Sequence, residues 1–123
     1  MKTIYITLGG EERPLRYDIN AVTDIETVFG GRSLLTMLAN PAFFGFSLIR
    51  AMLWGGLKHR IKGLTLDRTG LMMQEYIEGG GSLQELSLKI NKALVEAGIF
   101  KEDKDEDNSE GNPPGPAVNT EKK

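Results

Sequence analysis

Residues 41–57 read PAFFGFSLIRAMLWGGL and form the most apolar run of the chain. Arg50 is the only charged residue in this run, and apolar side chains would cover nearly all sides of a helix drawn over it. Such a helix would be roughly 26 Å long, which is shorter than the ~30 Å hydrocarbon core of a bilayer. We therefore expect one central helix over 41–57, capped by Asn40 and wrapped by the rest of the domain or by a partner.

The amino-terminal segment predicts a β-hairpin. Apolar and polar residues alternate over 3–8, and the alternation resumes over 14–18 after a longer loop at 9–13. Two strands alone are only marginally stable, so the hairpin must pack on helices or pair with another chain. The same alternation is unlike a signal peptide, and we expect a cytoplasmic protein.

Helical spacing of apolar residues predicts further helices on both sides of the central run. Asp18 or Asn20 caps the first, Thr65 caps a later one, and Ser82 with Glu85 forms a capping box before the last. Together with the hairpin, these helices predict an α+β fold in which a small N-terminal β-hairpin packs on four or five helices. The predicted helices other than the central one cover about residues 18–29, 33–39, 66–78 and 83–97.

Charge and composition change near residue 100. Residues 1–100 carry 11 Lys and Arg against 10 Asp and Glu, whereas residues 101–123 carry 4 against 7. This acidic, Pro-containing tail holds too few apolar side chains to offset the entropy cost of ordering it. We expect a single domain over 1–100 and a disordered tail over 101–123.

Few side chains are suited to catalysis or metal binding. The absence of cysteine excludes disulfides and thiolate chemistry, and His59 as the only histidine excludes a histidine-based metal cluster. The run Gly79-Gly80-Gly81-Ser82 lacks the lysine and the preceding strand of a phosphate-binding loop. We expect no catalytic, cofactor-binding or metal-binding residues, and we interpret the protein as non-enzymatic.

Apolar side chains are the better candidates for function. Phenylalanine, tryptophan and methionine residues of this kind often fill a core, yet so much adaptable apolar surface also suits a chain that packs around a partner protein. The candidate partner-binding residues are Phe43, Phe44, Phe46, Met52, Trp54, Met72 and Met73.

One basic cluster leaves a second interpretation open. Arg50, Lys58, Arg60 and Lys62 could contact phosphates if the chain were a small helical nucleic-acid-binding protein. Helix-end charge explains the same residues, and the nearly neutral domain has no bulk positive field. We therefore expect no nucleic-acid partner and, from the length of the apolar run, no membrane insertion.

Several segments in a fixed order carry a resemblance to a known family. They are ITLGGEERPLRYD over 6–18, INAVTDIETVFG over 19–30, LWGGLKH over 53–59 and LTLDRTGL over 64–71. This order resembles the tail assembly chaperones of long-tailed phages and the related gene transfer agent tail proteins, over roughly residues 4–97. The pair Gly55-Gly56 and the acidic tail depart from the family pattern.

The resemblance implies a small helper protein of the host cytoplasm, encoded by a phage or prophage. Such a protein binds the tape measure protein and keeps it soluble while the tail tube protein assembles around it. It has no catalytic residues, and it could be a homo-oligomer. A structural tail subunit, such as a tube or completion protein, is the alternative.

Overall fold

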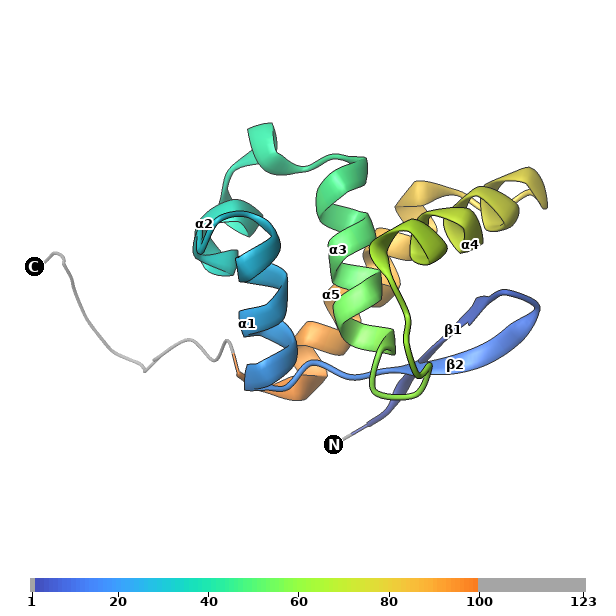
Figure 1. The fold of residues 1–123 in the computed structure, drawn as a ribbon, viewed down its shortest axis with the longest axis horizontal. Coiled ribbons are helices and arrows are strands. Elements are labelled where there is room, and N and C mark those ends of the chain that lie inside the picture. Colours follow the sequence, from blue (N-terminus) through green and yellow to red (C-terminus); the bar gives the residue numbers. More distant parts are fainter. Residues whose placement is uncertain (1, 100–123) are drawn as a thin grey trace, which may run out of the picture.

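A computed structural model describes residues 2–99, and it confirms the α+β class and the N-terminal hairpin packed on helices (Figure 1). The predicted tail over 101–123 lies outside the described residues. The elements are β1 (Ile4–Leu8), β2 (Glu11–Leu15), α1 (Ile19–Val28), α2 (Leu34–Ala39), the 3-10 helix η1 (Pro41–Phe43), α3 (Phe46–Leu57), α4 (Leu66–Glu78) and α5 (Leu83–Ala97).

The hairpin is tighter than the sequence pattern predicts. Strands β1 and β2 pair antiparallel, and β2 begins at Glu11, so that the connecting loop is only Gly9-Gly10 and the predicted longer loop over 9–13 is wrong. Both glycines have positive φ (62° and 77°), which suits a two-residue turn between twisted strands. The inward face carries Ile6 and Leu8, and it packs against α5, α4 and α3.

The predicted single helix over 41–57 is interrupted. Asn40 Oδ1 accepts the N–H of Ala42 at 3.0 Å and caps η1, as expected for the start of the run. Phe44 and Gly45 are then extended, and α3 begins at Phe46. Glycine has low helix propensity, and Gly45 lacks a Cβ that would favour continuing the helix. The break separates the first aromatic residues of the run from its buried part.

Helix α3 is the centre of the domain, as predicted for this run. It contacts α1 on one side and α4 and α5 on the other, and β2 crosses near its carboxyl end (Figure 1). Its buried residues are Leu48, Ile49, Ala51, Met52, Leu53, Gly55, Gly56 and Leu57.

The paired glycines of α3 allow neighbouring segments to approach its backbone. A Cβ on Gly55 would lie 2.6 Å from the Ile25 side chain, and a Cβ on Gly56 would lie 2.8 Å from the Tyr17 ring. The N–H of Arg16 donates to the carbonyl of Gly56 at 2.9 Å. The link between β2 and α1 is therefore attached directly to the α3 backbone.

The predicted helix starts are confirmed by hydrogen bonds. Asp18 Oδ1 accepts the N–H of Ala21, which makes Asp18 and not Asn20 the cap of α1. Thr65 caps α4, and Ser82 with Glu85 forms the complete capping box of α5. None of the helices between residues 2 and 99 combines the length and the apolar character needed to cross a membrane.

Candidate functional site

Large apolar side chains are exposed along the segment that runs from α2 through η1 to the start of α3. We call this set the aromatic corner; it consists of Leu35, Phe43, Phe44 and Phe46. Leu35, Phe44 and Phe46 are 56%, 50% and 66% exposed. Groups of exposed apolar side chains often mark protein interaction sites. In Figure 1 the segment from α2 to the start of α3 lies away from the hairpin.

The local sequence explains why these rings face outward. Asn40 and Pro41 begin η1, and the extended pair Phe44-Gly45 carries the chain from η1 into α3 without completing a helical turn. Phe46 is the first residue of α3 and lies before the buried residues of that helix begin at Leu48. The short elements therefore leave Phe44 and Phe46 with no neighbouring element to cover them fully.

Phe43 links the corner to the core. Its side chain is partly buried and packs against the hydrophobic core. The guanidinium of Arg32, from the loop between α1 and α2, lies 4.7 Å from the centroid of the Phe43 ring. This cation–π contact holds one positive charge at the edge of the aromatic corner.

The structure divides the seven candidate residues into two groups. Phe44 and Phe46 are 50% and 66% exposed and Phe43 is partly buried, whereas Met52, Met72 and Met73 are only 2%, 8% and 5% exposed. The methionines belong to the core of the folded domain, and this corrects the expectation that they contribute partner-binding surface. Their unbranched, flexible side chains suit irregular gaps between packed helices.

Trp54 also has a structural role in the folded domain. Its indole N–H donates to the carbonyl of Leu64 at 3.0 Å, and the Lys58 ammonium lies 5.0 Å from its ring centroid. The side chain is partly buried and packs against the core. Trp54 therefore connects α3 to the loop before α4 and lies outside the aromatic corner.

The sequence pattern did not indicate Leu35, which belongs to the corner, or Arg32, which lies beside Phe43 at its edge. Leu34 and Met37 occupy the buried side of the short helix α2, and both are completely buried. Leu35 follows Leu34 by about 100° around a helix and so faces away from the core. The sequence does carry one indication of this, because α2 holds more apolar residues than one face of so short a helix can bury.

The four basic residues of the predicted cluster do not form one unpaired patch. Arg50 Nη1 lies 3.9 Å from Asp67 Oδ1 on α4, and Lys58 forms an ion pair with Asp24 on α1. Arg60 and Lys62 are exposed in the loop between α3 and α4. Two of the four charges are thus used in contacts between helices.

The chain was compared with known protein families, curated proteins and solved structures. No family model, no curated protein and no solved structure matches this chain.

Proposed function

We propose that this protein is a non-enzymatic tail assembly chaperone that binds the tape measure protein of a long-tailed phage through the aromatic corner. The order of segments over residues 4–97 supports the choice of family. We choose the aromatic corner as the binding surface because Phe44 and Phe46 are 50% and 66% exposed. Tail tube protein is the expected second partner in the same assembly.

The chemistry of the corner suits a helical partner. A tape measure protein of the kind implied by the resemblance is long and helical, and an amphipathic helix presents a stripe of apolar residues at i, i+3, i+4 and i+7. A buried aromatic ring covers roughly 150–250 Å² and supplies a large part of an interface's binding energy. Arg32 beside Phe43 could pair with an acidic residue flanking such a stripe.

The proposal is tested by co-expression with the tape measure protein of the same phage. The double variant Phe44→Ala/Phe46→Ala is expected to lose the complex. Truncating two anchor rings costs at least about 2 kcal/mol, which weakens Kd about 30-fold. The readouts are the soluble fraction of the partner, its co-purification, and Kd by calorimetry.

A matched control separates this surface from general apolar exposure. Leu71 on α4 and Val95 on α5 are 67% and 68% exposed but belong to other elements. The double variant Leu71→Ala/Val95→Ala is expected to bind like the unmodified chain. If the unmodified chain leaves the partner insoluble and forms no complex with it, the chaperone assignment is wrong. Stable multimers that survive dilution would instead favour a structural tail subunit.

A further inference from the structure

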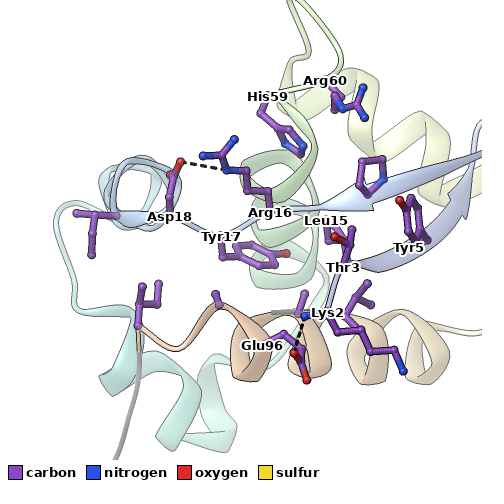
Figure 2. Close-up of a pocket in the computed structure, with 16 residues that line it drawn as sticks. Lys2, Thr3, Tyr5, Leu15, Arg16, Tyr17, Asp18, His59, Arg60 and Glu96 are labelled. Atoms are coloured by element: carbon purple, nitrogen blue, oxygen red, sulfur yellow. Dashed lines mark hydrogen bonds and ion pairs between the residues drawn. The ribbon is translucent and has the colours of Figure 1, made fainter.

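An open groove of about 610 Å³ is lined by none of the residues of the aromatic corner (Figure 2). The start of the hairpin, the link from β2 to α1, the loop after α3 and the carboxyl end of α5 surround it. Ile4, Leu15 and Ile99 contribute apolar lining. Its charged residues are Lys2, Arg16, Asp18, Arg60 and Glu96, and His59 also lines it.

One rim of this groove is positively charged. Figure 2 shows the side chains of Arg16, His59 and Arg60 following one another along that rim. The pKa of His59 is lowered, first by partial burial and then by repulsion from Arg16 and Arg60. The two arginines are therefore close enough to His59 to act on it electrostatically, and the rim is suited to anionic groups.

The acidic residues of the groove already have partners. Asp18 accepts the N–H of Ala21 through Oδ1 at 2.8 Å, and its Oδ2 lies 3.6 Å from Arg16 Nε. Glu96 Oε1 accepts the backbone N–H of Lys2 at 3.0 Å. Within residues 2–99, no ion pair involves Arg60 or the Lys2 ammonium. The positively charged side chains of the groove thus outnumber its own carboxylates.

The last described residue of the chain, Ile99, is part of the lining of this groove. Gly98 adopts a left-handed conformation (φ 73°) after α5 ends, which turns the backbone away from the helix axis. Residues 102–107, immediately downstream, read EDKDED and carry five carboxylates and one lysine. Eight residues, from 100 to 107, can span at most about 26 Å when fully extended.

We propose that the acidic segment 102–107 binds this groove of its own domain, with its carboxylates on Arg16 and Arg60 on either side of His59. Guanidinium groups pair with carboxylates through two parallel hydrogen bonds, which makes Arg16 and Arg60 the main contacts. The short covalent connection gives the segment an effective concentration of about 1 mM at the groove. The segment therefore binds there in preference to an acidic peptide from another molecule. The bound segment connects the hairpin, the loop after α3 and the end of α5.

The test uses the full chain and a single spin label. Because the chain has no cysteine, Ser109→Cys provides one labelling site just beyond the acidic segment. At low salt the amide NMR signals of Arg16, His59 and Arg60 are expected to lose most of their intensity. The amide signals of Gly79–Gly81 should keep their intensity. At 1 M salt, where the Debye length falls to about 3 Å, the rim signals should recover.

Charge variants separate binding from simple proximity. Neutralising the segment as Glu102→Gln, Asp103→Asn, Asp105→Asn, Glu106→Gln and Asp107→Asn keeps its length and is expected to restore the rim signals at low salt. Neutralising Glu110 and Glu121 instead should leave the loss of the rim signals at low salt unchanged. Arg60→Glu should also release the segment, whereas Lys62→Glu, which lies outside the groove lining, should not.

Two results would overturn the proposal. One is an equal loss of rim signal with the neutralised segment, because the effect would then reflect only the tether. The other is signal loss on an unlabelled, isotope-enriched copy mixed with labelled chain, since the segment would then bind a second molecule.

Discussion

Tyr17 connects the link between β2 and α1 to the central helix α3. Its side chain is 3% exposed, and its hydroxyl donates to the carbonyl of Met52 at 2.7 Å. The Met52 carbonyl lies inside α3, so this bond adds a side-chain contact to the helical backbone. Burial of the phenol group raises the pKa of Tyr17 far above its ordinary value of 10.0.

Tyr17→Phe is expected to lower the free energy of unfolding by about 0.5–1.5 kcal/mol at neutral pH, because a buried hydrogen bond is lost. Above pH 10 the unfolded chain releases the Tyr17 proton while the folded chain keeps it. The stability contribution of Tyr17 is thus complete below the unfolded pKa and declines above it, by at most about 1.4 kcal/mol per pH unit. The variant should therefore lose stability less steeply above pH 10.

Urea denaturation of both chains at neutral pH and above pH 10 measures this difference. Tyr5→Phe, at a 46% exposed position, is the matched control and should leave the stability at neutral pH nearly unchanged. Parallel stability curves for the original chain and Tyr17→Phe above pH 10 would contradict the buried, protonated phenol.

At the scale of elements, helix packing depends on the paired glycines Gly55 and Gly56 inside α3. Gly56→Ala would place a Cβ 2.8 Å from the Tyr17 ring and 3.1 Å from Leu15. The hydrogen bond to Met52 restrains that ring, so we expect a loss of about 1–3 kcal/mol despite the better helix propensity of alanine.

Gly70→Ala in α4 is the matched comparison. Its Cβ would meet only the Arg50 side chain, at 3.3 Å from Cδ, and that partly exposed side chain can shift. We expect a gain of up to about 1 kcal/mol from helix propensity. Thermal unfolding of the two variants should move in opposite directions, and a stabilised Gly56→Ala variant would show that α3 and the Tyr17 segment are not closely packed.

At the scale of the whole molecule, the hairpin and helices share one core. Leu8 of β1 is 1% exposed within the same hydrophobic cluster as the helices. Leu8→Ala is expected to cost about 2–5 kcal/mol and to shift the unfolding of the entire domain. Fluorescence of Trp54 and far-UV circular dichroism should report one coincident transition before and after the change.

Thr7→Ala, the exposed neighbour on the same strand, should shift neither signal appreciably. If Leu8→Ala left both transitions in place, the hairpin would be an independent unit that unfolds separately from the helices.

Much of the local structure followed from the residues alone. The alternation over 3–8 predicted β1. Thr65 and the Ser82–Glu85 box marked helix starts that the hydrogen bonds confirm, and of the two predicted caps Asp18 and Asn20 the structure selects Asp18. These features depend on contacts between residues close in the chain, so the sequence carries them completely. The length of the hairpin loop was missed because Glu11 and Glu12 look like turn residues, although cross-strand pairing places them in β2.

Burial, in contrast, was decided by packing. The sequence grouped Phe44 and Phe46 with Met52, Met72 and Met73, and only the arrangement of helices separates the exposed rings from the buried methionines. Likewise, the groove brings Lys2, Arg16, His59 and Glu96 together from four distant segments. Composition and periodicity specify which residues are apolar or charged. The neighbours that each of these side chains contacts depend on which faces of the helices are covered, and the tertiary structure decides this.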